Sequence, residues 1–162
     1  RRASGRQLER ETTMRLVIGG SGHLEYRDLV SFELAKLHRR CRVMVLIHGG
    51  LGGVCAAAED WARRAGVHVV RYPPNWVRYG KTAEAVRNRF MLKDARPDLV
   101  AAFPGGPHTL DLVRCALRAR LAVYEVPERD VPAQTILDRA DGPPGRDRSN
   151  GLRSQRAIVL HI

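Results

Sequence analysis

The sequence has few cysteines and no long apolar run. Its three cysteines, Cys41, Cys55 and Cys115, form no CxxC pair and have no histidine at zinc-finger spacing, so they indicate neither a disulfide framework nor a structural metal site. No segment reaches the roughly 18 consecutive apolar residues of a membrane-spanning helix. The polar segment 1–13 lacks the apolar stretch of a secretory signal, which makes Met14 a candidate natural start. We therefore expect a soluble cytoplasmic protein that requires no metal or other cofactor.

Lysine is also scarce, although the chain is strongly basic. The formal net charge is +11, and lysine occurs only at Lys36, Lys81 and Lys93. Clustered arginines suit a nucleic-acid backbone, but aromatic residues make up only 6% of the chain and form no ladder on which bases would stack. A solvated basic surface is therefore the favoured interpretation, and nucleic-acid binding ranks last among the functions considered.

Three apolar segments each run directly into a glycine-rich loop. They are LVIGGSG at 16–22, VMVLIHGGLGG at 43–53 and LVAAFPGGPHT at 99–109. Paired glycines let the backbone approach a ligand, and the start of a following helix offers free amide donors. In the third loop, Thr109 is suited to cap that helix or to bind a phosphate oxygen. One such loop often serves turn geometry alone, but three at one edge of a parallel sheet predict a single pocket for an anionic small molecule.

Apolar strands alternate with helical patterns along the chain. This alternation predicts a single α/β domain over 14–126, a Rossmann-like three-layer fold with a mostly parallel sheet and helices on both faces. The segment 1–13 is expected to be a polar extension, and the Pro-, Arg- and Gly-rich segment 127–162 a disordered tail that ends in a short apolar stretch. The expected strands are 15–18, 43–47, 67–72, 99–103 and 121–126, and the expected helices are 26–38, 54–65, 83–92 and 110–118.

A further loop, PPNWVRYGKT at 73–82, completes an ordered set of motifs. The set reads HGG-x-x-G, a helix ending in WA, P-x-W with GK, RN-x-x-M and AFPGG-x-x-T-x-D. In this order it resembles the YspA/YpsA-related (cpYpsA-related) branch of the SLOG superfamily, over about 14–126. These Rossmann-like nucleotide-binding proteins are related to the Lonely Guy phosphoribohydrolases and, more distantly, to the DNA-processing protein A fold. The resemblance implies a nucleotide-like ligand.

The resemblance also implies a set of ligand-binding residues. Arg87 is suited to a bidentate phosphate contact, Asn88 to a ribose or base edge, and Trp76 to stacking on a ring. Two alternatives stay open, namely that Trp76 anchors the core and that Arg87 is a surface ion-pair partner. The implied positions are Gly20, Ser21, His48, Gly49, Gly50, Gly53, Trp76, Lys81, Arg87, Asn88, Pro104, Gly105, Gly106 and Thr109.

The chain departs from the family pattern at four positions. Gly22 stands where the first loop usually has arginine, Cys55 where the second loop usually ends in aspartate, and His108 where a glycine is usual. Leu112 occupies the place of the glutamate on which N-glycosidic hydrolysis depends in the Lonely Guy relatives. Asp111 is the nearest carboxylate and so the candidate catalytic residue, but on a helix it points about 100° away from that position.

These departures favour binding over catalysis. We expect the chain to bind or sense a nucleotide or a derivative, such as a nucleoside monophosphate or an ADP-ribose-like compound. The alternatives are a phosphoribohydrolase that cleaves nucleoside monophosphates and, last, a DNA-binding Rossmann-like module. Whether the chain forms a homodimer is left open.

Overall fold

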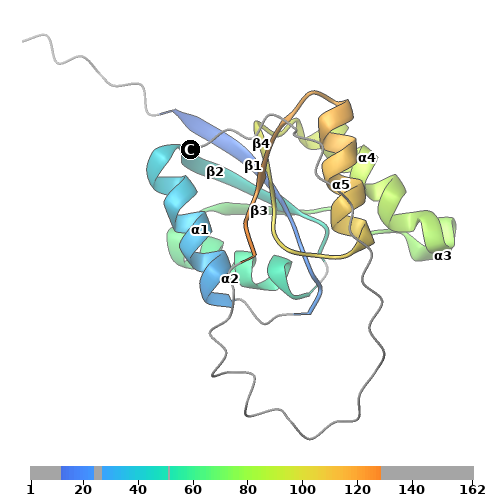
Figure 1. The fold of residues 1–162 in the computed structure, drawn as a ribbon, viewed down its shortest axis with the longest axis horizontal. Coiled ribbons are helices and arrows are strands. Elements are labelled where there is room, and N and C mark those ends of the chain that lie inside the picture. The colour runs from blue at the N-terminus through green and yellow to red at the C-terminus, as the bar shows by residue number, and fades with distance from the viewer. Residues whose placement is uncertain (1–11, 24–26, 51, 129–162) are drawn as a thin grey trace, which may run out of the picture.

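The structure, a computed structural model, describes residues 12–23, 27–50 and 52–128 (Figure 1). In this part of the chain five strands form one sheet in the order β3-β2-β1-β4-β5, and every pairing is parallel. The fold is therefore α/β and Rossmann-like, as the alternating pattern predicted. The strands are β1 (Thr13–Gly19), β2 (Arg42–His48), β3 (His68–Arg71), β4 (Leu99–Ala102) and β5 (Ala122–Glu125), and the helices are α1 (Arg27–Arg40), α2 (Val54–Ala65), α3 (Trp76–Tyr79), the short 3-10 helix η1 (Gly80–Thr82), α4 (Ala83–Ala95) and α5 (Pro107–Arg118).

Helices cover both faces of the sheet, as Figure 1 shows. On one face α1 and α2 pack Leu34 and Trp61 against Leu16 and Leu46 of the central strands. On the other face, residues of α4 and α5 pack against the strand residues that point the opposite way, such as Val17 and Ile47. Strand residues alternate between the two faces, so the central strands must be apolar at nearly every position. Burial of each large aliphatic side chain contributes about 1.5–3 kcal/mol to folding.

The carboxyl ends of the central strands create the place for a site. The chain steps from β1 to β2 on one side and later returns to β4 on the other side of β1. In open α/β sheets, ligands bind outside the carboxyl ends of the strands at such a reversal of strand order. All three glycine-rich loops follow strands that end here, since they leave β1, β2 and β4.

Several helices differ from the expectation drawn from sequence; α1 and α4, for example, extend to Arg40 and Ala95, beyond the expected ends at 38 and 92. Helix α5 begins at Pro107, three residues before the expected start, because proline at the first helical position has a suitable fixed φ and needs no amide partner. Segment 76–79, expected to be loop, forms the short helix α3, and the side chain of Asn75 accepts a hydrogen bond from the Arg78 amide at its start. The expectations for 1–11, Tyr26 and 129–162 lie outside the described residues. No helix in the described part is long and apolar enough to cross a membrane.

Candidate functional site

The three glycine-rich loops are joined through the backbone of Ser21. Its amide donates to the Pro104 carbonyl at 3.0 Å, and its carbonyl accepts from the amide of Val54, the first residue of α2, also at 3.0 Å. The first amide of α2 is therefore already occupied by the protein. Within the described residues, the amides of Gly105 and Gly106 donate no hydrogen bond. The amino end of α5 consequently offers donors to an anion at this edge.

Several of the glycines are required by loop packing. Gly53 has a φ of 65°, and a Cβ there would overlap the Ser21 carbonyl. A Cβ on Gly20 would lie 2.9 Å from the Phe103 side chain. At Gly105 it would overlap the Thr109 hydroxyl, whereas at Gly106 no atom lies within 4 Å. The glycine pattern therefore serves loop-to-loop contact at several positions, whereas Gly22 and Gly106 leave open space.

We expect Gly53→Ala to destabilise the fold by about 3 kcal/mol, because alanine at this φ is strained and overlaps backbone. This corresponds to a Tm lower by roughly 10 °C. Gly22→Ala is the matched control, since its φ is not positive and a Cβ there meets no atom within 4 Å. Thermal unfolding of both variants checks the prediction. Equal Tm values would show that the loop contact does not constrain Gly53.

Arg87, on α4, reaches across the edge of the sheet. Its guanidinium lies against Gly49, so closely that a Cβ on that glycine would overlap it. The Arg87 Nε donates to Asn88 Oδ1 at 2.9 Å, and Nη1 donates to the Tyr72 carbonyl at 3.2 Å. No carboxylate of the described residues forms an ion pair with Arg87, and burial lowers the pKa of its guanidinium. Arg87 is therefore not a surface ion-pair partner. Its hydrogen bonds go to neutral groups, and the carboxylates of Glu84 and Asp111 act on its half-buried charge only through space.

Asn88 and Asp111 form a contact between α4 and α5. Asn88 is buried, and its Nδ2 donates to Asp111 Oδ2 at 2.9 Å. Asp111 therefore points toward α4, while its neighbour Leu112 lines the cavity between the loops. This matches the expectation that Asp111 faces away from the position of the relatives' glutamate.

His48 holds the second glycine loop in place. Its Nδ1 accepts the Gly50 amide hydrogen at 2.9 Å, which leaves Nε2 to carry the proton, and Nε2 lies 2.8 Å from Glu59 Oε1. Glu59 also forms an ion pair with Arg71 at the end of β3. His48 is therefore a buried support of the Gly49–Gly50 loop, and it does not line the cavity. Sequence reasoning missed Glu59, because nothing near it in the chain marks it as a partner of His48.

Burial lowers the pKa of His48 below its ordinary value of 6.5. The unfolded chain thus binds a proton at pH values where the folded chain does not, so the contribution of neutral His48 to stability is lost as pH falls below 6.5. Arg71 holds the pKa of Glu59 below 4.5, so the carboxylate's contribution persists until lower pH. We expect the wild-type Tm to fall between pH 7 and pH 5, and His48→Asn, which can still accept the Gly50 hydrogen, to show a smaller fall. Identical pH profiles would contradict this role.

The cavity enclosed by the loops is small, at about 40 Å³. That is little more than the share of liquid volume of one water molecule. His108 stands at its margin with its side chain 62% exposed, and its Nδ1 pairs with the buried carboxylate of Glu84 on α4. Sequence reasoning did not single out Glu84. The lining residues are Ile18, Gly19, Gly20, Gly49, Cys55, Arg87, Asn88, Met91, His108, Thr109 and Leu112.

The structure brings together most, but not all, of the expected binding residues. Thr109 lines the cavity but does not cap α5, because the helix begins earlier and Gly106 is its N-cap. Trp76 and Lys81 lie apart from the cavity, and Trp76 is 49% exposed, so it is no core anchor. The described residues contain no group of three His, Cys, Asp or Glu side chains suited to a metal. Seven of the expected binding residues build the surrounding loops without lining the cavity, namely Ser21, His48, Gly50, Gly53, Pro104, Gly105 and Gly106.

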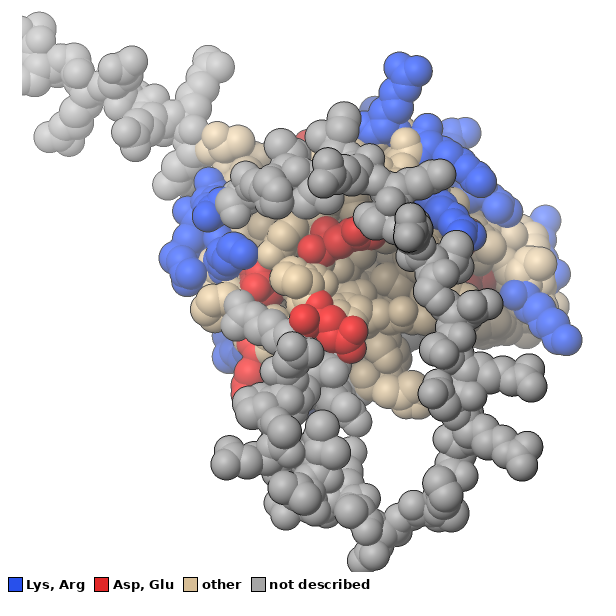
Figure 2. All heavy atoms as spheres, in the orientation of Figure 1, with Lys and Arg blue, Asp and Glu red and all other residues tan. Residues whose placement is uncertain are grey.

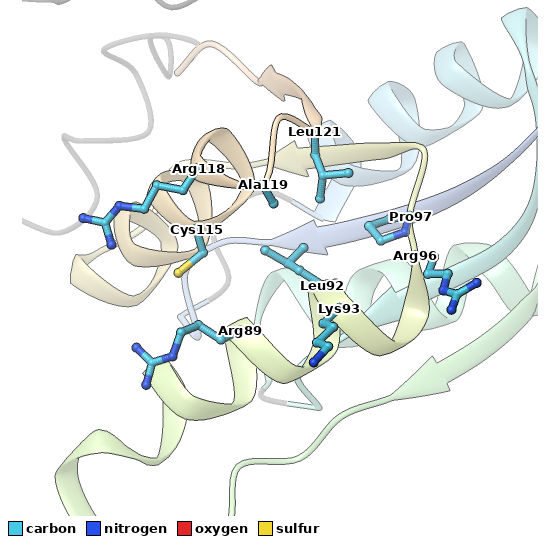
Figure 3. Close-up of a pocket in the computed structure, with 9 residues that line it drawn as sticks. All are labelled: Arg89, Leu92, Lys93, Arg96, Pro97, Cys115, Arg118, Ala119 and Leu121. Carbon is cyan, nitrogen blue, oxygen red and sulfur yellow. The ribbon is translucent and has the colours of Figure 1, made fainter.

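A larger hollow lies between α4 and α5, away from the glycine loops (Figure 3). It has a volume of about 540 Å³, an apolar floor that includes Leu92 and Cys115, and basic side chains around it, such as Arg89 and Arg118.

On the face shown in Figure 2, basic side chains gather in separate groups over α1 and over α4 and α5, with acidic and neutral residues between them. The described residues visible on this face therefore form no continuous basic track for a nucleic-acid backbone.

Comparison with known proteins identifies the family to which this chain belongs. The model of the YspA, cpYpsA-related SLOG family matches residues 14–79. The Gene 61 protein of Mycobacterium phage D29 is 36% identical over 98 residues, which cover 57% of this chain and 78% of the phage protein. The chain belongs to the YspA, cpYpsA-related SLOG family.

Two solved structures align with much of this chain at low TM-scores. The calicheamicin glycosyltransferase CalG4 is 18% identical with a TM-score of 0.39, and the match covers 84% of this chain and 38% of that protein. Glycinamide ribonucleotide transformylase 1 from Symbiobacterium toebii is 20% identical with a TM-score of 0.40, and the match covers 85% of this chain and 66% of that protein.

Proposed function

We propose that the chain binds or senses a phosphorylated nucleotide or nucleotide derivative at the carboxyl edge of its sheet. The observation that carries the proposal is Arg87, a half-buried guanidinium with no carboxylate partner among the described residues. Burying a cation that has no carboxylate in direct contact is costly, and Glu84 and Asp111 act on Arg87 only through space. A ligand phosphate would supply that charge.

The neighbouring groups fit the same ligand. The unpaired amides of Gly105 and Gly106 lie at the amino end of α5, where the helix dipole favours an anion. Arg87 and this helix end both border the same small cavity, through Arg87 itself and through Thr109 in the first turn of α5. A nucleoside monophosphate or an ADP-ribose-like compound would place its phosphate here, with Arg87 turned toward it.

A thermal-shift panel tests this proposal. A ligand that binds only the folded chain adds about 2.7 kcal/mol of stability at 100 times its Kd. We expect nucleoside 5′-monophosphates or ADP-ribose to raise the Tm, and the matching nucleosides, which lack phosphate, to raise it much less. A panel in which no nucleotide raises the Tm more than its nucleoside would refute the proposal.

A phosphoribohydrolase remains the alternative, and the carboxylates argue against it. Asp111 is held by Asn88, Glu84 is paired with His108, and Leu112 lines the cavity where the relatives have glutamate. None of these carboxylates lines the small cavity beside Arg87, so none of them faces a ligand bound there.

We therefore expect no multiple-turnover release of free base when the protein is incubated with nucleoside monophosphates and the products are separated by chromatography. Release that disappears in Asp111→Asn would establish the hydrolase and make Asp111 its catalytic acid or base. Release that disappears in Glu84→Gln instead would assign that role to Glu84.

A further inference from the structure

A second hollow adjoins the candidate phosphate site. It has a volume of about 380 Å³ and lies between the segment that follows β3 and the helices α3 and α4. Aromatic rings form much of its wall, namely Tyr72, Tyr79 and Phe90. Tyr79 and Phe90 are 37% and 59% exposed, although their rings would be better buried in a core. Exposed aromatic side chains gathered around a hollow mark a binding surface.

Arg87 connects the two hollows. It lines the small cavity between the glycine loops and also the aromatic hollow on its other side. The second glycine loop lies beside the same boundary, since a Cβ on Gly50 would be 4.0 Å from Pro73 of the aromatic hollow. A ligand held by Arg87 would therefore have direct access to the aromatic rings.

The volumes of the two hollows indicate that they hold different parts of a ligand. The cavity of about 40 Å³ cannot hold a base and a ribose, whereas a hollow of about 380 Å³ lies within the range of small-molecule sites. The aromatic hollow also contains a polar group. The Oδ1 of Asn75 accepts the Arg78 amide hydrogen, which fixes the side-chain amide and leaves its NH₂ as a donor, with no acceptor for it among the described residues.

We propose that the base of the nucleotide binds in this aromatic hollow, against Phe90 and Tyr79, while Arg87 holds the phosphate. The inference rests on the proposed function and deepens it, because it assigns the ligand an aromatic ring and a place for that ring. It also moves the stacking role away from Trp76, which does not line the hollow. The NH₂ of Asn75 donates to an acceptor atom on the edge of the base.

Calorimetric titration with two ligands tests this assignment. Ribose 5-phosphate carries the phosphate without a base, and AMP, GMP, CMP and UMP carry both. We expect at least one of these nucleotides to bind more tightly than ribose 5-phosphate. Phe90→Ala should weaken binding of that nucleotide by about tenfold, the effect of losing one aromatic stacking partner, and leave the affinity for ribose 5-phosphate within twofold of wild type.

Phe32→Ala is the matched control, because Phe32 is 49% exposed on α1 and does not line the hollow. It should change neither affinity. Phe90→Leu keeps apolar contact with Tyr72 and serves if the alanine variant fails to fold. The base assignment is wrong, although phosphate binding stands, if ribose 5-phosphate binds as tightly as every nucleotide or if Phe90→Ala weakens both ligands equally. Absence of binding by all ligands would overturn both proposals.

Discussion

Replacing Arg87 by alanine is expected to weaken nucleotide binding by about 1.5–3 kcal/mol, the range for hydrogen bonds to a charged group. The corresponding increase in Kd is about 10- to 150-fold. The Tm should change little, because in the protein Arg87 bonds only to Asn88 and to the Tyr72 carbonyl and forms no ion pair among the described residues. Arg87→Lys keeps the charge but loses the planar guanidinium, so its affinity for the nucleotide should lie between those of the wild-type protein and Arg87→Ala.

The control for this prediction is Arg89→Ala. Arg89 lies two residues further along α4, is exposed, and borders the hollow of Figure 3 and not the cavity between the loops. Calorimetric titration gives the affinities, and thermal unfolding gives the stabilities. An Arg87→Ala protein that binds normally but unfolds at a much lower temperature would make Arg87 a support of the fold and not a ligand contact.

Gly106→Val is expected to weaken nucleotide binding by about 100-fold, because its branched side chain would cover the amides at the start of α5 and remove contacts worth about 3 kcal/mol. The fold should persist, since the φ of Gly106 is −88° and no atom lies within 4 Å of the added Cβ.

Gly106→Ala separates this steric effect from helix capping. Alanine and valine are both poor N-cap residues and cost about 1 kcal/mol of helix stability, but the methyl group covers less of the amides. The difference in affinity between the two variants therefore reports the steric block alone. If Gly106→Val folds and binds as tightly as Gly106→Ala, phosphate does not bind at this helix end.

The sequence predicted the sheet and the edge where the loops meet, because both follow from local patterns. The central strands had to be apolar on both faces, as Val17 and Leu16 illustrate, and each ran into glycines. It does not predict the start of α5, since the sequence pattern places Pro107 in the loop, whereas the helix begins at this residue. It could not separate glycines needed for packing, such as Gly53, from Gly106, because that distinction depends on contacts between distant loops.

The sequence also does not predict which side chains support the site. Glu84 and Glu59 lie on helices whose apolar and polar spacing is ordinary, and they acquire partners only when the helices pack against the sheet edge. The aromatic hollow combines Tyr72 from the segment after β3 with Phe90 from α4, 18 positions later. The binding roles of Arg87, Asn88 and the loop residues stay predictions, and the structure adds the geometry from which they can be tested.

Calorimetric titration of the wild-type protein with nucleoside 5′-monophosphates and ADP-ribose, each phosphate-bearing ligand compared with its nucleoside, tests the central claim most directly. We predict saturable binding of at least one phosphate-bearing ligand with one site per chain, and a Kd at least about tenfold higher for the matching nucleoside, since one charge-assisted phosphate contact is worth at least that factor. Equal affinity for a nucleotide and its nucleoside, or no binding by any phosphate-bearing ligand, would contradict the account.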